Sequence, residues 1–108
     1  MGKIASGQPD LARRVATGSF TGTGAGAWME VGGSAFNVVL SGTFVATVVG
    51  EYSFDGGVTA VPATTRDGAE FSVAAPGAWT GEQPEPGVLF RLRCASFTSG
   101  TVAWRISR

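Results

Sequence analysis

The sequence predicts an all-β protein: a single antiparallel β-sandwich of about seven short strands, jelly-roll or Ig-like, with an extended N-terminal arm. Three observations support this prediction. Short runs of alternating apolar and polar residues are separated by turn residues at intervals of roughly 8–12 residues. Glycine contributes 17 of the 108 residues, which is typical of a turn-rich β protein. Asp55, Gly56 and Gly57 stand between two apolar runs and suit a tight hairpin turn.

The first 27 residues differ in composition from the rest of the chain. Residues 18–26 are small residues apart from Phe20, so this segment has little apolar surface to bury. We therefore predict a flexible, glycine-rich arm over residues 1–27 and a sandwich domain over residues 28–108.

The predicted strands follow one another closely within the domain. Gly50 suggests a bulge or bend in the longest strand, and Pro62 argues for an edge position, because proline cannot donate a ladder hydrogen bond. Residues 78–87 contain Trp79 and an acidic, proline-rich stretch, and we predict loops there. The strands are expected at residues 28–31, 35–40, 43–54, 58–63, 70–74, 88–96 and 101–107.

The last two predicted strands form the clearest element, a C-terminal hairpin. Alternation places Cys94 on its inward face, so we expect a buried, unreactive thiol, and a lone cysteine forms no internal disulfide. The same alternation places Arg91, Arg93 and Arg105 together on the outward face.

Ser53, Asp55 and Gly57 match an Asp-box hairpin, Ser-x-Asp-x-Gly. In such a turn the carboxylate accepts backbone N–H groups and glycine takes a positive φ. We therefore interpret Ser53, Asp55, Gly56 and Gly57 as a structural turn and not as ligands.

The sequence offers little material for catalysis. It contains no histidine, and Glu51, Asp55, Glu82 and Glu85 have no spacing that forces a carboxylate pair together. Metal sites need histidine, cysteine or clustered acids. We predict a protein that is not an enzyme and that has no cofactor and no metal.

Charge is balanced overall but unevenly distributed. Residues 1–29 carry a net charge of +2, residues 30–85 of −6 and residues 86–108 of +4. Zero net charge argues against nucleic acid, and no stretch is long and apolar enough to span a membrane. We predict a homo-oligomer in which basic residues meet the acidic middle of another copy. The predicted subunit interface comprises Arg91, Arg93, Arg105 and Trp79.

Aromatic residues suggest a different kind of function. Trp28, Trp79 and Tyr52 could build a platform on which a sugar stacks. A glycan-binding surface module is therefore an alternative, although coverage of a neighbouring subunit is the more ordinary explanation of Trp79.

Four stretches of the chain stand out together: LSGTFVATV (40–48), YSFDGG (52–57), PEPGVLFRL (84–92) and TSGTVAWR (98–105). In these stretches the chain resembles small β-structured virion proteins of tailed bacteriophages. Similar sequences tend to carry tryptophan where this chain has Ala60. The resemblance implies a structural role in the virion, assembled in the host bacterial cytoplasm.

From this resemblance we expect a capsid decoration or cement protein that binds the major capsid protein or neighbouring virion proteins. A tail or tail-fibre component is the alternative. The predicted arm would then supply the capsid contacts, through Lys3, Arg13, Arg14 and Phe20.

Overall fold

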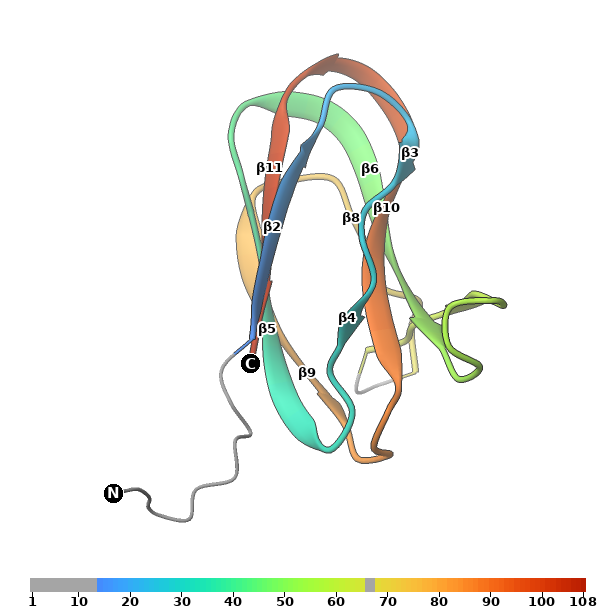
Figure 1. The fold of residues 1–108 in the computed structure, drawn as a ribbon. Helices are drawn as coiled ribbons and strands as arrows, with labels where there is room; N and C mark the ends of the chain where they lie inside the picture. The colour runs from blue at the N-terminus through green and yellow to red at the C-terminus, as the bar shows by residue number, and fades with distance from the viewer. Residues whose placement is uncertain (1–13, 66–67) are drawn as a thin grey trace.

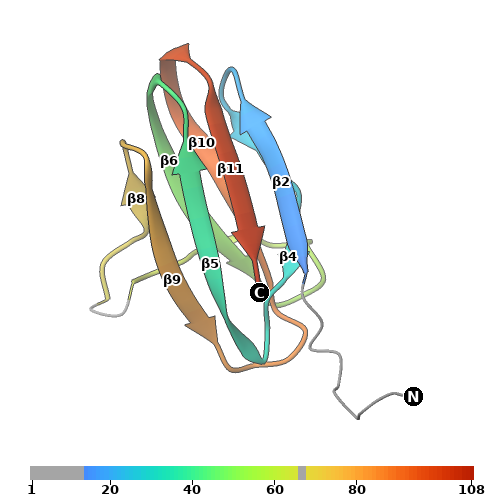
Figure 2. The same cartoon turned by 90° about the vertical axis from the view of Figure 1, so that its left-hand side faces the viewer.

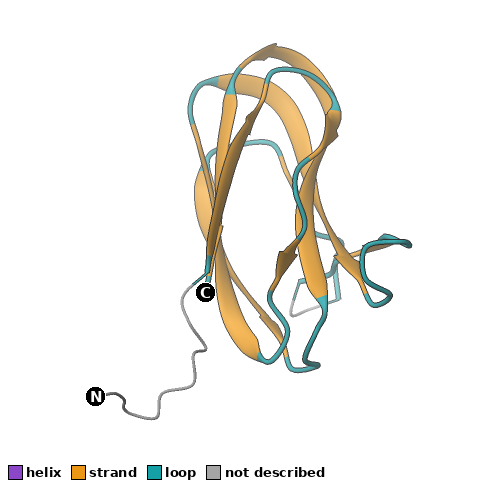
Figure 3. Cartoon of the chain, viewed as in Figure 1, coloured by secondary structure: helices purple, strands orange, loops and turns teal. Residues whose placement is uncertain are grey.

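The computed structural model describes residues 14–65 and 68–108 as two antiparallel sheets packed face to face (Figure 1). This confirms the predicted all-β sandwich: the described residues form strands joined by loops and turns (Figure 3). Among these residues, none belongs to a helix that could cross a membrane. The strands are β2 (Val15–Phe20), β3 (Gly24–Ala25), β4 (Met29–Glu30), β5 (Ser34–Ser41), β6 (Phe44–Ser53), β7 (Val61–Pro62), β8 (Ser72–Val73), β9 (Gly77–Gln83), β10 (Leu89–Gly100) and β11 (Val102–Ser107).

The larger sheet is built around the antiparallel pair β6 and β10. Strands β3 and β4 pair with β10, and β7 and β8 pair with β6. Pro62 lies in the edge strand β7, as predicted. The bulges of this sheet fall in β10, between Cys94 and Ser96 and between Phe97 and Ser99, so the bulge predicted at Gly50 is wrong. A Cβ on Gly50 would lie 2.9 Å from the Phe90 ring, so glycine is needed there for packing.

The smaller sheet has the order β2-β11-β5-β9 (Figure 2). The connection at Gly100 carries the chain from β10 in the larger sheet to β11 in this one. The predicted C-terminal hairpin is therefore wrong in its pairing, although both of its strands exist. Alternation along one strand cannot show which strand lies beside it.

Residues 14–27 belong to the sandwich, so the predicted domain boundary at residue 27 is wrong for this part of the chain. Strand β2 pairs with β11 along its full length, from Phe20 opposite Val102 to Val15 opposite Ser107. Phe20 is only 6% exposed, and its ring stacks on Trp104 with centroids 6.1 Å apart. Residues 1–13 of the predicted arm lie outside the described residues.

The glycines of this segment create room for Trp104. A Cβ added to Gly18 would lie 2.6 Å from the indole ring, and one added to Gly26 would lie 2.9 Å from it. The small residues that predicted a flexible arm thus allow the backbone to lie directly over the buried Trp104 ring.

Strand β9 was not predicted, because the segment containing Trp79 was expected to be a loop. It forms the free edge of the smaller sheet and pairs with β5 from Gln83 opposite Ser34 to Gly77 opposite Leu40. A Cβ on Gly81 would lie 2.6 Å from the Phe36 ring, so the strand approaches β5 closely. Glycine and threonine in β9 obscured the alternation that predicts a strand.

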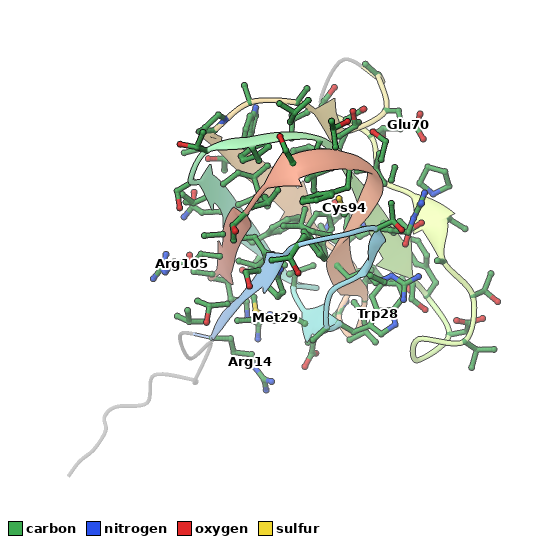
Figure 4. The ribbon with its side chains drawn as sticks, turned by 90° about the horizontal axis from the view of Figure 1, so that it is seen from above. Arg14, Trp28, Met29, Glu70, Cys94 and Arg105 are labelled. Carbon is green, nitrogen blue, oxygen red and sulfur yellow. The ribbon has the colours of Figure 1, made fainter. Side chains whose placement is uncertain are left out.

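The core fills the space between the two sheets. Cys94 is 1% exposed and lies between the ribbons in Figure 4, which agrees with its predicted inward position. The other fully buried large side chains come from both sheets: Leu40, Leu92, Ile106, Val31, Val38, Val48, Val88 and Val102.

Candidate functional site

The turn after β6 is fixed by its own side chains. The Ser53 hydroxyl donates to the Asp55 carboxylate and accepts the N–H of Gly57, both at 2.8 Å, and the N–H of Thr59 donates to Asp55, also at 2.8 Å. Gly56 and Gly57 have φ values of 77° and 97°. These are the contacts expected of a structural turn. Hydrogen bonds from Thr59 and then from Ser53 lower the pKa of Asp55 to about 2.

This turn holds apolar side chains in solvent. The loop between β6 and β7 projects away from both sheets (Figure 1). Phe54 is 54% exposed and Val58 is 85% exposed, and we call these two residues the apolar tip. The sequence pattern hides this exposure, because Phe54 continues the alternation of one predicted strand and Val58 begins the next apolar run.

The three arginines predicted to share one face do not do so. Arg91 and Arg93 lie in β10 of the larger sheet, whereas Arg105 lies in β11 of the smaller sheet. In Figure 4, Arg105 points outward on the left, and Trp28, which stacks on Arg91, lies on the right. The predicted cluster is wrong because its strands belong to different sheets.

Arg91 and Arg93 bind an acid of their own chain. Their Nε atoms donate to the two carboxylate oxygens of Glu51, at 2.8 and 2.9 Å. Burial alone would raise the pKa of Glu51, but the hydrogen bonds and charges of the two arginines outweigh it and lower this pKa. The Arg91 guanidinium also lies 4.3 Å from the centre of the Trp28 ring. The side chain of Glu51 is only 13% exposed, so little of it remains for a second subunit.

A weaker ion pair joins the N-terminal part of the described chain to the acidic middle. Arg14 lies 3.8 Å from Glu30, and both side chains are well exposed, so the pair adds little stability. Arg14 was predicted to bind the capsid, and its guanidinium remains largely accessible for such a contact. Phe20 was predicted in the same role, but its burial excludes a direct contact in this conformation. Lys3 and Arg13 lie outside the described residues.

The four carboxylates considered for catalysis lie in different places. Glu51 pairs with arginines, Asp55 closes the turn, Glu82 lies in β9 and Glu85 follows that strand. Within residues 14–65 and 68–108, no three groups among histidine, cysteine, aspartate and glutamate gather as metal ligands would. Burial raises the pKa of the Cys94 thiol, which disfavours the reactive thiolate.

Two of the three aromatic residues proposed as a platform do come together. Tyr52 and Trp79 line one open cleft of about 640 Å³ between the free edge of β9 and the segment that follows β7. Trp28 lies against Arg91 and Gly57 on the outer face of the larger sheet, so it is not part of this cleft. The polar residues lining the cleft include Thr64, Thr80, Glu82 and Gln83.

Contacts between rings connect the two cleft aromatics through the core. Tyr52 packs on Phe90 at 5.5 Å between centroids, Phe90 on Phe71 at 6.5 Å, and Phe71 on Trp79 at 5.7 Å. Trp79 and Tyr52 are both half-buried, so each has one part in the core and another at the cleft.

Comparison of the chain with models of protein families, with curated proteins and with solved structures finds no match.

Proposed function

We propose that this chain is a non-enzymatic structural protein of a tailed-bacteriophage virion, which decorates the capsid by binding the major capsid protein. The observation that best supports the proposal is the apolar tip, Phe54 and Val58, held in solvent by the hydrogen-bonded turn of Ser53 and Asp55.

Exposed apolar side chains are common singly, but a projecting pair on a fixed turn favours a docking role. A turn that is already ordered loses little conformational entropy on binding, so more of the contact energy becomes affinity. Aromatic residues are enriched among the few side chains that dominate such interfaces. The tip therefore fits an apolar pocket on a protein surface.

The resemblance to phage virion proteins supports the major capsid protein as the partner. A shell presents many equivalent copies of its major protein, so modest contacts add by avidity if the decorating protein is itself oligomeric. The proposal needs no catalytic group, and it does not depend on residues 1–13.

Co-sedimentation with virions tests the proposal. Particles produced without this chain are mixed with the purified protein and with the double variant Phe54→Ser/Val58→Ser. We expect the variant to bind at least about tenfold more weakly, because burying the tip contributes on the order of 2 kcal/mol. Val45→Ser is the matched control, since Val45 is 59% exposed and lies on β6, outside the apolar tip. Equal binding by the double variant and the unchanged protein contradicts the role of the tip.

Cryo-electron microscopy of particles that contain the chain distinguishes the capsid from the tail. Density on the icosahedral shell is the expected result. Density confined to the tail would instead support the alternative of a tail or tail-fibre component.

A further inference from the structure

We propose that the cleft beside β9 binds a neutral saccharide, with Trp79 as the stacking surface. This site adjoins the apolar tip, because the Tyr52 ring contacts the Phe54 ring with centroids 6.1 Å apart, but it does not depend on the virion proposal. Its volume of about 640 Å³ is within the range of small-molecule sites and can hold a short oligosaccharide.

The aromatic lining fits a pyranose ring. One face of such a sugar carries C–H bonds, which pack on the electron-rich face of an indole or phenol ring. Trp79 is only half-buried, so part of its ring remains available after packing on Phe71. A Cβ on Gly77 would lie 2.9 Å from the Trp79 ring, so the indole lies closely over the backbone of its own strand.

The polar lining fits the hydroxyl groups that surround such a ring. Gln83 offers an amide, Thr64 and Thr80 offer hydroxyls, and Glu82 offers a carboxylate. The amide and the hydroxyls both donate and accept, and the carboxylate accepts, so the set suits a ligand whose hydroxyls do both. Thr80 and Gln83 already hold hydrogen bonds, to Asn37 and to the N–H of Glu85 respectively, which restrict their side chains.

The charge of the cleft indicates which sugars it excludes. Glu82 is the one charged side chain among the described residues that line it, and no described arginine or lysine does so. An acidic sugar would be repelled by the Glu82 carboxylate. The Glu82 carboxylate therefore favours neutral saccharides over sialylated or uronic ones.

Contacts with the core hold the aromatic side of the cleft in place without a ligand. Tyr52 and Trp79 are linked by the ring contacts through Phe90 and Phe71, and Gly81 brings β9 against Phe36. A sugar entering the cleft thus meets side chains that need little rearrangement, which favours measurable affinity from a small contact.

The test is an NMR titration of the full chain with maltotriose, cellotriose and the N-acetylglucosamine trimer, and with sialyllactose as the acidic comparison. We expect at least one neutral trisaccharide to shift amide signals of β9, Tyr52 and Thr64, with a dissociation constant of about 1 mM or tighter. Trp79→Ala should weaken this binding by about tenfold or more. Trp28→Ala should leave it unchanged, because Trp28 lies on the outer face of the larger sheet.

Trp79 also packs in the core, so Trp79→Ala could lose binding because the chain misfolds. A second variant separates loss of binding from loss of folding. Gln83→Ala changes a residue at the cleft without removing a ring, and it should weaken binding while the amide spectrum stays that of the folded chain. The absence of shifts with all three neutral sugars contradicts the proposal, as does stronger binding of sialyllactose. Binding that survives both Trp79→Ala and Gln83→Ala would place the sugar elsewhere and also contradict it.

Discussion

At the scale of single residues, the hydrogen bonds of Asp55 in the turn make the stability of the fold depend on pH. Its pKa falls from an ordinary value of 3.8 to about 2 in the folded chain, because Thr59 and Ser53 donate hydrogen bonds to the carboxylate. A group whose pKa is lower in the folded chain than in the unfolded chain stabilises the fold. Its contribution is complete at pH values above the unfolded-state pKa and is lost as the pH falls through the folded-state pKa. We expect the Asp55 contribution to disappear between about pH 4 and pH 2.

Carbon-detected NMR of the Asp55 carboxyl group measures this pKa directly, and urea unfolding at a series of pH values measures its effect. Asp55→Ala should be less stable than the unchanged chain at neutral pH and should lose less stability on acidification. The matched control is Glu70→Ala, whose carboxylate is well exposed and lies outside the turn. A measured pKa near 4 for Asp55 would mean that the turn does not hold the carboxylate as described.

At the scale of elements, the structure has strand β2 where a flexible arm was predicted. The effect of replacing Phe20 distinguishes a strand of the sandwich from a flexible arm. In an arm, Phe20→Ala would leave the stability of the sandwich unchanged. In the structure Phe20 is 6% exposed against Trp104, and removing a buried phenylalanine costs about 3–5 kcal/mol. Urea denaturation followed by tryptophan fluorescence should therefore show a large loss for Phe20→Ala. Val15→Ala, at the half-exposed start of the same strand, should cost much less.

Sequence patterns located those elements in which apolar residues alternate. Predicted strands at residues 35–40 and 43–54 correspond to β5 and β6, and the Asp55 turn follows directly from its residue types. Strands β2 and β9 were missed because their glycines hide the alternation. These glycines accommodate rings from other strands, Trp104 in one case and Phe36 in the other, and a linear pattern carries no record of such partners.

The candidate site was only partly accessible to the same reasoning. Tyr52 and Trp79 were singled out as aromatics that could stack on a sugar, but Trp28 was grouped with them. The face of the sheet decides this grouping, because Tyr52 packs on Phe90 in the core and Trp28 packs on Arg91 on the outer face of the larger sheet. The arginines were grouped wrongly because of the strand pairing, since Arg105 belongs to the other sheet.

At the scale of the whole molecule, the two sheets share one core, and the lone cysteine reports on its integrity. Cys94 lies in β10, which pairs with three other strands, and its thiol is 1% exposed and donates to the carbonyl of Ser96. Burial also raises the pKa of the thiol, so reaction with a disulfide reagent requires opening of the sandwich. We expect native labelling to be at least about 1,000-fold slower than labelling of the unfolded chain.

Low concentrations of urea should accelerate this labelling in parallel with the loss of global stability, because β10 is paired with strands on both of its sides. The matched control moves the thiol to the surface: Ser96→Cys in a Cys94→Ser background places it at an exposed position two residues along the strand. That thiol should react at nearly the rate of the unfolded chain. If Cys94 itself reacted within about tenfold of that rate, β10 would open locally, and the sheets would not unfold as one cooperative unit.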